Sequence, residues 1–501
     1  MEHVYQFLYS SKVNYPSRPF VTEDRCWTYD EVCQYTGKLT DFLLKKGVRE
    51  NDKVILYIEN SVEYVISFFA VLKAGAVVIP ITTTSTKAWI EDIVSESDAA
   101  LILTSNKLLQ KIENVSYIAS DKIMVVDLDK IADLENCQCL EQYKNNEVAM
   151  FIYTSGTTSK SKGVMLSHKN LITNTESILS YLKLGCNDKI LATLPFTYSY
   201  GNSILLTHTR AGASMHICKQ ENYIQVVLSL LEQGDYTGFS TVGSYIKLLV
   251  SQKNFTRETL EKLRYITLAG EQSSKESVLQ IHEMLPELKI YIMYGQTEAS
   301  ARISYLEPDR LVEKCGSVGK GIKGVTIKIV NEDRKEAEPY EKGEIIVQGD
   351  NIMLGYWKRP EETEEVLKDN WLYTNDIGYM DLEGYLYVVG RKNDIIKYLG
   401  HRISPLEIEN YINKSENIAE SAVVDWHDKD DNVKIVAFVV LKTKGDDVSY
   451  LKKDLRKVLP VFKVPSAFYI VEELPRTSNG KIKRKDLKLR LEEDDGKKDI
   501  W

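Results

Sequence analysis

The segment from Thr154 to Gly163 constrains this chain more than any other. It contains six hydroxyl side chains, two lysines and two glycines. The apolar run Val148–Tyr153 precedes it and the short apolar run Val164–Leu166 follows it, so we expect a loop between two strands. Glycine lets backbone N–H groups approach an anion, hydroxyls donate hydrogen bonds and lysine neutralises charge, which suits a polyphosphate. A flexible surface loop rich in serine and threonine is the alternative, and the spacing is not that of a Walker A loop.

Length and charge limit the classes of protein that fit. A chain of 501 residues predicts a large domain and at least one smaller one. The formal net charge of −8 gives no basic field for nucleic acid or an anionic membrane. The seven cysteines are scattered and odd in number, which favours a reduced cytoplasmic location over a disulfide framework. The histidines show no ligand spacing, so no transition-metal site is expected.

The N-terminus and the longest apolar run predict no membrane insertion. The first residues lack the basic and apolar regions of a signal peptide. The run Val65–Ile81 contains Lys73, Gly75 and Pro80. We therefore interpret it as a core helix followed by a strand, not as a membrane span.

Helical and strand patterns alternate over the first 300 residues, which predicts layered α/β structure with largely parallel sheets. Short strands and turns between Val325 and Tyr387 predict a small β-rich subdomain, antiparallel or barrel-like. The pattern after Gly390 is α+β. We expect an N-terminal core at 1–390, a hinge at 391–394 and a small mobile C-terminal domain at 395–501. The expected helices are Glu31–Lys46, Val62–Ala74, Asn222–Glu232, Thr241–Val250, Glu407–Asn413 and Tyr450–Val458. The expected strands include Lys53–Ile58, Ala76–Ile81, Ala99–Thr104, Tyr265–Leu268, Ile290–Met293, Glu420–Asp425 and Val433–Leu441.

Three further segments carry candidate chemistry. Tyr294–Glu298 follows a predicted strand and offers an aromatic face, a hydroxyl and a carboxylate, which suit a base, a phosphate and Mg²⁺; an ordinary turn is the alternative. Tyr373–Asp376 places a carboxylate in a turn, where it holds ribose hydroxyls or caps the backbone. Lys481 follows a turn glycine in a basic segment, which is otherwise a surface patch. The match of Gly319–Gly324 to G-x-G-x-x-G precedes a strand, so we interpret it as a turn.

Together and in this order, the motifs resemble the adenylate-forming superfamily, which includes acyl-CoA synthetases, aryl-acid ligases, peptide-synthetase adenylation domains and luciferases. The resemblance covers nearly the whole chain. Besides the segments above, it rests on Trp27–Tyr29, Leu72–Ala76, Gly343-Glu344, Gly355–Trp357, Gly390-Arg391, Gly400–Ile403, Leu459–Pro465 and Gly480-Lys481.

The resemblance implies an ATP site with assigned roles. Tyr294 would stack on adenine, Thr297 would contact the α-phosphate, Glu298 would bind Mg²⁺, and Lys481 would bridge the substrate carboxylate and the α-phosphate. Because that carboxylate is ionised at pH 7, catalysis needs positioning and charge neutralisation but no general base. The implied ATP and AMP contacts are Thr154, Ser155, Gly156, Thr157, Thr158, Lys162, Gly270, Glu271, Gln272, Tyr294, Gly295 and, on the ribose, Asp376 and Arg391.

The resemblance also implies a second step, in which a thiol attacks the acyl-adenylate. The C-terminal domain would swing about Asn393, and Gly400 would line a pantetheine tunnel. The thiol belongs to CoA or to the phosphopantetheine of a holo-carrier protein. Four positions depart from the family pattern: Ser159 and Ser161 replace glycine and proline, Asn375 replaces glycine, and Asn393 replaces a charged residue. Asn375 is compatible with a left-handed turn.

The resemblance places an acid pocket at Tyr198, Ser199, Tyr200, Phe239, Val242, Ala299 and Arg302. Amino-acid-activating relatives carry aspartate where this chain has Ser199, and a buried ammonium without a carboxylate is costly, which argues against an α-amino acid. The aromatic and apolar residues favour an aliphatic or aryl acid, although core packing would also explain the tyrosines. Arg302 is expected to pair with a structural carboxylate, with a second polar group on the acid as the alternative.

Four functions stay open at this point. The first is a ligase that forms an acyl-adenylate and then a thioester. The second is an enzyme that hands acyl-AMP to one dedicated carrier protein, including an adenylation enzyme for an amino acid. The third is a luciferase-like oxygenase, and the fourth is a nucleotide-binding module without turnover.

Overall fold

The computed structural model describes residues 1–134, 147–154, 161–221, 223–271, 274–394, 396–398, 401–427, 433–443, 448–476 and 482–493, without the side chains of 393, 397, 401, 402, 492 and 493. The chain divides into two compact units, one of residues 1–327 with 347–372 and the other of residues 328–346 with 373–501. The expected boundary at 390 stays a prediction. In the described part of the chain, no helix is both long and apolar enough to cross a membrane.

The first unit contains a seven-stranded sheet that carries the predicted phosphate loop. Its strands β7 and β8 form an antiparallel hairpin in which Thr154 pairs with Lys162, so the two predicted strands are confirmed, and residues 155–160 between them lie outside the described residues. The neighbours from β7 to β6 are parallel. In spatial order the strands are β18 (Gly355–Tyr356), β8 (Lys162–Ser167), β7 (Val148–Thr154), β4 (Val77–Pro80), β3 (Lys53–Tyr57), β5 (Ala99–Thr104) and β6 (Ile123–Val125).

A nine-stranded sheet lies in the same unit. Its neighbours from β13 to β1 are parallel, as the alternating pattern predicts. In spatial order the strands are β15 (Lys320–Gly321), β14 (Ser304–Leu306), β13 (Lys289–Tyr294), β12 (Tyr265–Leu268), β11 (Gly238–Thr241), β9 (Lys189–Ala192), β10 (Ser214–Ile217), β1 (Pro19–Thr22) and β2 (Cys26–Thr28). The segment Gly319–Gly324, expected to be a turn before a strand, leads into the strand β16 (Val325–Val330), but its residues Lys320–Gly321 form the short strand β15.

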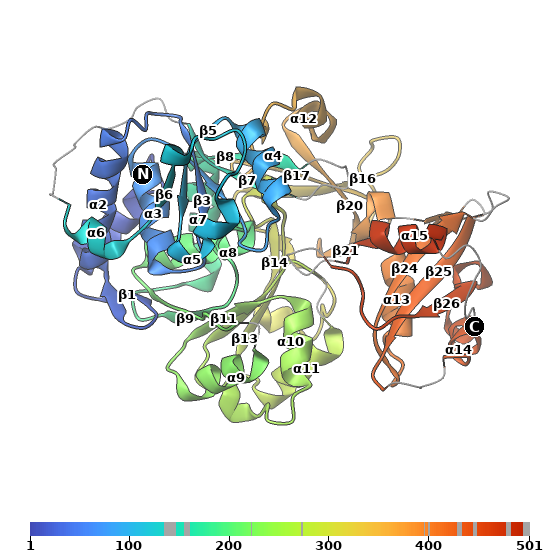
Figure 1. The fold of residues 1–501 in the computed structure, drawn as a ribbon. Helices are drawn as coiled ribbons and strands as arrows, with labels where there is room; N and C mark the ends of the chain where they lie inside the picture. Colours follow the sequence, from blue (N-terminus) through green and yellow to red (C-terminus); the bar gives the residue numbers. More distant parts are fainter. Residues whose placement is uncertain are drawn as a thin grey trace. The chain divides into compact units, whose positions relative to one another are not determined.

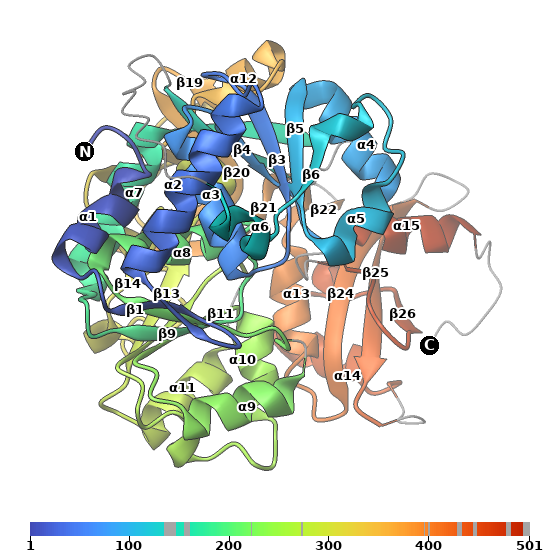
Figure 2. The same cartoon turned by 60° about the vertical axis from the view of Figure 1, so that its left-hand side comes forward.

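Helices cover the sheets of the first unit. Alternate strand residues such as Ile55 and Ile79 form one core with α4 and α5, while α3 is buried on nearly every side. Figure 2 shows α4 and α5 beside β5 and β6, with α2 and α3 across β3, and Figure 1 shows α9, α10 and α11 beside β11 and β13. The helices are α1 (Gln6–Asn14), α2 (Tyr29–Lys45), α3 (Val62–Lys73), α4 (Lys87–Ser97), α5 (Asn106–Ile112), α6 (Leu128–Ala132), α7 (His168–Leu182), α8 (Ser199–Ala211), α9 (Ile224–Gln233), α10 (Gly243–Val250), α11 (Lys275–Met284) and α12 (Pro360–Val366).

The helix expected at Thr241–Val250 begins later than predicted. Thr241 is the last residue of β11, and the helix starts at Gly243. Strand and helix are separated by the single residue Val242, which leaves too few positions for the change of apolar period to show in the sequence. The helix expected at Glu407 instead starts at Pro405, because proline fits the first helical position.

The β-rich region and the C-terminal α+β region match their predicted classes. The β-rich region forms a five-stranded sheet, β16-β17-β20-β19, with β21 beside β20. In the C-terminal region, α13 and α14 pack on one face of β24 and β25, and α15 packs on the other. The elements are β17 (Gly343–Gly349), β19 (Leu367–Lys368), β20 (Trp371–Met380), β21 (Leu386–Arg391), β22 (Ile396–Tyr398), β23 (His401–Ile403), α13 (Pro405–Ile412), β24 (Ile418–His427), β25 (Val433–Leu441), α14 (Leu451–Val458), β26 (Ala467–Ile470) and α15 (Arg484–Glu493).

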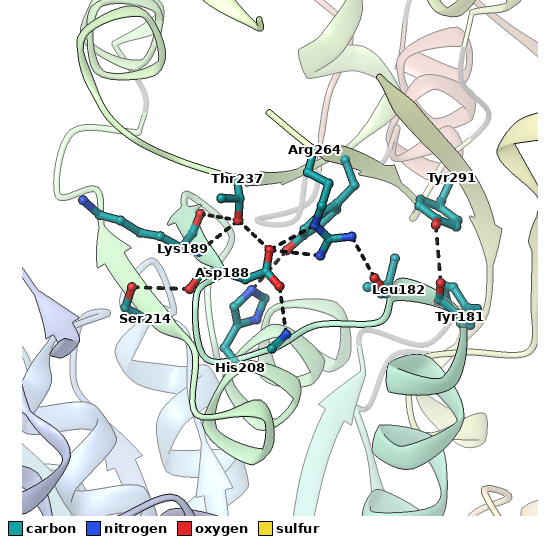
Figure 3. Close-up of polar contacts among 11 residues, drawn as sticks. Tyr181, Leu182, Asp188, Lys189, His208, Ser214, Thr237, Arg264 and Tyr291 are labelled. Atoms are coloured by element: carbon teal, nitrogen blue, oxygen red, sulfur yellow. Dashed lines mark hydrogen bonds and ion pairs between the residues drawn. The ribbon is translucent and has the colours of Figure 1, made fainter. Parts of the chain in front are cut away.

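A polar network ties together the amino ends of β9, β11 and β12. The Asp188 carboxylate accepts hydrogen bonds from Nε and Nη2 of Arg264, at 3.1 and 3.0 Å, and from the Thr237 hydroxyl at 2.8 Å. Arg264 Nη1 also donates to the carbonyl of Leu182, at 3.0 Å. Figure 3 shows these side chains converging on Asp188. The network thus holds the amino ends of three strands together. Val242 follows the carboxyl end of β11, and Tyr294 is at the carboxyl end of β13, so both lie at the opposite edge of the sheet.

The buried Glu23 makes stability depend on pH. Its carboxylate accepts a hydrogen bond from the Val62 amide, at 3.1 Å, and lies 3.6 Å from Lys219 Nζ. Burial raises the pKa of Glu23 to about 7, against an ordinary value of 4.5. Because the folded-state pKa is the higher one, the stabilising contribution is complete below about pH 4.5 and is lost as pH rises to about 7.

We therefore expect Glu23→Gln to raise the free energy of unfolding by about 1–3 kcal/mol at neutral to mildly alkaline pH and to have little effect in acid. Urea unfolding across this pH range measures the difference. Asp24→Asn is the matched control, because Asp24 also pairs with Lys219 but is exposed. A Glu23→Gln protein with the wild-type pH profile would contradict the assignment.

Candidate functional site

The loop after β13 has a backbone shape that few sequences allow. Ser300 and Ala301 both have positive φ, 53° and 91°, which is costly for residues other than glycine. At Gly295 a Cβ atom would lie 1.9 Å from the carbonyl oxygen of Ala301, so this position excludes every side chain. The loop therefore folds tightly back on itself directly after Tyr294, the last residue of β13.

Two asparagines hold this loop in place. Asn351 Nδ2 donates to the carbonyls of Ala299 and Arg302, both at 3.0 Å, and Ser300 Oγ donates to the Asn351 carbonyl at 2.8 Å. Asn174 Nδ2, from α7, donates to the Arg302 carbonyl at 2.9 Å. These bonds offset the cost of the strained backbone and fix the 3₁₀ turn Thr297–Ala299.

Glu298 and the end of the phosphate loop meet at one tyrosine. The Tyr356 hydroxyl donates to Oε1 of Glu298 at 2.9 Å, and Lys162 Nζ lies 5.0 Å from the centre of the Tyr356 ring. Tyr356 is in β18, which pairs with β8. The sequence did not predict a role for Tyr356. The signal that could have pointed to it was the Gly355–Trp357 motif, which contributes to the family resemblance. The structure thus brings the predicted metal ligand and a predicted phosphate ligand together.

The donor set at Glu298 fits a magnesium ion bound mainly by a nucleotide. Tyr356 uses one carboxylate oxygen, and a carboxylate offers about four lone-pair sites, so the other oxygen can bind a cation. Magnesium is typically held by one or two carboxylates together with substrate phosphates and water. Within the described residues no cluster of three or more His, Cys, Asp or Glu side chains is suited to hold a metal.

Other predicted nucleotide ligands lie at the carboxyl ends of neighbouring parallel strands. Tyr294 ends β13, and Gly270 follows β12, which pairs with β13. Gly270 has φ of +93°, and the next residue, Glu271, accepts a hydrogen bond from the amide of Ser244. Ligands of open α/β sheets bind at such ends. Tyr294, Gly295, Gly270 and Glu271 therefore lie where a nucleotide site is expected.

Several predicted site residues lie outside the described residues, and their roles stay predictions. They are Ser155, Gly156, Thr157, Thr158, Gln272, Gly400 and Lys481, together with the altered loop position Ser159 and the side chain of Asn393.

The second unit pairs the two predicted ribose ligands with each other. Asp376 and Arg391 are cross-strand neighbours on β20 and β21, and Arg391 Nε lies 2.9 Å from Asp376 Oδ1. The Asp376 carboxylate is nearly buried. Asn375 adopts φ of 57°, so its predicted tolerance of a left-handed turn is confirmed.

Ser161, where the family pattern has proline, is tethered instead of loose. Trp89 Nε1, from α4, donates to Ser161 Oγ at 2.7 Å. This bond anchors the carboxyl end of the predicted phosphate loop to a helix that is 72 positions earlier in sequence. The loss of proline at 161 is therefore compensated at this end of the loop.

We expect Ser161→Ala and Trp89→Phe to raise KM for ATP about threefold to tenfold, because each removes one hydrogen bond worth about 0.5–1.5 kcal/mol. The double variant should show no further increase, and thermal stability should change little. Steady-state kinetics with varied ATP measures this. Additive effects of the two substitutions would show that they act separately, against the tether.

The predicted acid pocket is partly assembled around the start of α8. Thr297 Oγ1 donates to Ser199 Oγ at 3.4 Å, and the Tyr200 hydroxyl bonds to the carbonyl and hydroxyl of Thr267 at 2.9 and 2.8 Å. Phe239 and Ala299 are fully buried. Val242 is half-buried beside Gly270, and Tyr198 precedes the helix as its N-cap residue.

The expected structural carboxylate for Arg302 is not found. Arg302 is buried, yet no described acidic side chain forms an ion pair with it. Its guanidinium instead lies over the ring of Tyr200, 4.9 Å from the centre. Local sequence does not reveal this, because an ion-pair partner is chosen by tertiary packing.

A small cavity borders Ser199. Its lining is mixed, with the polar residues Asn174, Asn202, Ser203 and Ser300 and the apolar residues Ile152, Leu166 and Leu206, and its volume of about 10 Å³ is at the lower limit for holding one water molecule. Asn174 Oδ1 and Asn202 Nδ2 are buried without protein partners.

Comparison with known proteins agrees with this geometry. The AMP-binding enzyme family matches residues 9–357, and the AMP-binding enzyme C-terminal domain matches residues 407–481. A 2-succinylbenzoate–CoA ligase of Geobacillus sp. is 30% identical, with 94% of this chain and 96% of the relative covered. A long-chain-fatty-acid–CoA ligase of Bacillus subtilis is 31% identical, with 92% and 89% covered.

A solved structure resembles the whole chain. The O-succinylbenzoate coenzyme A synthetase of Bacillus subtilis, in complex with ATP and magnesium ion, aligns with a TM-score of 0.86 at 27% identity, covering 96% of this chain and 99% of that one. The layered α/β fold with a small C-terminal region is thereby confirmed. With a family match over most of its length, this chain belongs to the AMP-binding enzymes.

Proposed function

We propose that this protein is an acid–thiol ligase, which activates a carboxylic acid with ATP and transfers the acyl group to a pantetheine thiol. The observation that carries the proposal is the convergence of Lys162, Tyr356, Glu298 and Thr297 at one end of the hairpin β7–β8. That convergence joins a phosphate ligand, a magnesium ligand and a contact to the acid pocket. The named relatives, which are CoA ligases, support the same reaction.

In the first step a carboxylate oxygen of the acid attacks the α-phosphorus of ATP, and the bond to pyrophosphate breaks. Magnesium, when bound, would neutralise phosphate charge. Tyr294 stacks on the adenine, Thr297 orients the α-phosphate, and Lys162 attracts the departing pyrophosphate. Asp376 and Arg391 hold the ribose, and Lys481 neutralises charge between the carboxylate and the phosphate. The enzyme thus works by positioning charged groups already ionised at pH 7.

In the second step the thiol attacks the acyl carbonyl, and AMP leaves. We propose CoA as the thiol, because the two relatives named above are CoA ligases that align with nearly the whole chain. The domain swing about Asn393 and the role of Gly400 in the pantetheine tunnel belong to this step as proposals. A holo-carrier protein remains the second candidate acceptor, and the cytoplasmic location expected from the cysteines stays a prediction.

The acid is an aliphatic or aryl acid, not an α-amino acid. Ser199, at the start of α8, contacts Thr297, so the position next to the proposed α-phosphate contact carries a neutral hydroxyl. An α-ammonium group there would be buried without a carboxylate partner, which is energetically costly.

Acid-dependent exchange of labelled pyrophosphate into ATP tests the reaction class, across a panel of fatty, aryl and amino acids. We expect exchange with fatty or aryl acids, much less with amino acids, and thioester formation with free CoA. Thioester formation with a holo-carrier protein alone would favour the dedicated-carrier alternative. Absence of exchange with every acid would favour a binding module, and acid-dependent oxygen uptake or light would favour a luciferase-like enzyme.

A further inference from the structure

Arg302 is a buried cation without a counter-charge. The residue is 3% exposed, and its Nε atom has no hydrogen-bond acceptor. None of the acidic side chains that the structure describes forms an ion pair with it. Asn174 and Asn351 both donate hydrogen bonds to its backbone carbonyl, so these bonds fix the main chain from which the Arg302 side chain extends.

The groups that face the guanidinium do not supply the missing charge. They are the phenols of Tyr200 and Tyr181. Burial raises the pKa of Tyr181 to about 12 and raises the pKa of Tyr200 from its ordinary value, so both are neutral at pH 7. A cation–π contact contributes about 2 kcal/mol when desolvated, whereas burying an ion costs several kcal/mol. The protein alone therefore leaves Arg302 incompletely compensated.

Arg302 lies beside the proposed acid site. Tyr200, over which its guanidinium stacks, is the second residue of α8, and Ser199, the first, contacts Thr297. The loop after β13 thus contacts the first turn of α8 at two neighbouring residues. Thr297, the proposed α-phosphate contact, touches Ser199, and the guanidinium of Arg302 lies over Tyr200. The amino end of α8 adds a partial positive charge to this region. An anionic group would be stabilised there.

We propose that Arg302 binds a second anionic group of the substrate, so that the preferred acid is a dicarboxylic acid. This inference rests on the proposed function: one carboxylate reacts with ATP, and the other pairs with Arg302. The pairing supplies the counter-charge that the folded chain lacks. A neutral acid of the same length leaves the guanidinium buried and unpaired, and sites with unpaired buried polar groups reject such substrates strongly.

Pyrophosphate exchange with matched acids tests the proposal. The series runs from succinate to suberate, with each diacid compared with its monomethyl ester, and includes phenylacetate with its 4-carboxy derivative. For the best pair we expect the wild-type kcat/KM of the diacid to exceed that of the neutral acid by about 100-fold. A preference for the neutral acids throughout would overturn the proposal and leave the proposed function standing. No exchange with any acid would contradict both.

Two variants separate recognition from structure. Arg302→Met keeps the aliphatic stem and removes the charge, so it should lower kcat/KM for the diacid about 100-fold while the neutral partner is used as well as before or better. Arg302→Lys should retain part of the preference, because the charge remains but the planar donor fork is lost. Equal losses for both acids of a pair would assign Arg302 a purely structural role. Where Arg302→Met does not fold, the wild-type and lysine comparison decides.

Discussion

Replacing Glu298 with glutamine is expected to lower the rate of acid-dependent pyrophosphate exchange by about 100- to 1,000-fold, the range found when a preorganised electrostatic contact is removed. The substitution keeps the shape of the side chain and the hydrogen bond from Tyr356 but removes the charge that would bind magnesium. The magnesium concentration for half-maximal exchange should rise at least tenfold. Steady-state exchange with varied magnesium measures both quantities.

Tyr356→Phe is the matched control for this prediction. It leaves the Glu298 charge in place and removes only the 2.9 Å hydrogen bond that orients the carboxylate. A loss of about tenfold is expected, together with a smaller change in magnesium requirement. A Glu298→Gln protein that retains wild-type exchange and magnesium dependence would contradict the role of Glu298.

Asp188→Asn is expected to cause the largest loss of stability, about 2–4 kcal/mol. Breaking a buried ion pair leaves an uncompensated charge, which typically costs about 3–5 kcal/mol; the lower figure allows for the partial exposure of Arg264. Asparagine keeps the size of the side chain but accepts fewer hydrogen bonds from Arg264 and Thr237. The midpoint of urea unfolding, followed by fluorescence and by circular dichroism, measures the effect.

The exposed pair Arg257–Glu287 provides the control. Its atoms lie 2.6 Å apart, yet both side chains are at least half exposed, so Glu287→Gln should change stability by less than about 1 kcal/mol. Because Asp188 lies at the amino ends of the strands, KM values of Asp188→Asn should stay near wild type wherever the protein is folded. An Asp188→Asn protein as stable as Glu287→Gln would contradict the structural role of the network.

Local sequence patterns predict many of the strands and some of the helices, because apolar period and turn residues act within a few positions; α4, α7 and α8 were not among the expected helices. The strand Tyr265–Leu268 is placed correctly, and the strand expected at Ile290–Met293 is one residue short at each end. The boundary near Thr241 is wrong because a single residue, Val242, separates the strand from the helix, and the apolar period cannot show so short a junction. Tyr294 and Glu298 were predicted as site residues from their position after a strand and from the family resemblance, and their ligand roles stay predictions.

Contacts between distant segments are what the sequence does not reveal. Tyr356 reaches Glu298 from 58 positions away, and Trp89 reaches Ser161 from 72. Arginine usually pairs with a carboxylate, and the sequence led us to expect that for Arg302. Only the tertiary structure shows that its guanidinium lies against the neutral phenols of Tyr200 and Tyr181. Such features depend on how the two large sheets and their helices meet, which no local pattern encodes.

The central claim is that a carboxylate oxygen attacks the α-phosphorus of ATP. Turnover with an acid whose two carboxylate oxygens are ¹⁸O, followed by mass spectrometry of the products, tests it most directly. We expect one ¹⁸O atom in AMP, one in the thioester and none in pyrophosphate. AMP without label, or formation of ADP and labelled phosphate in its place, would contradict the proposed adenylation.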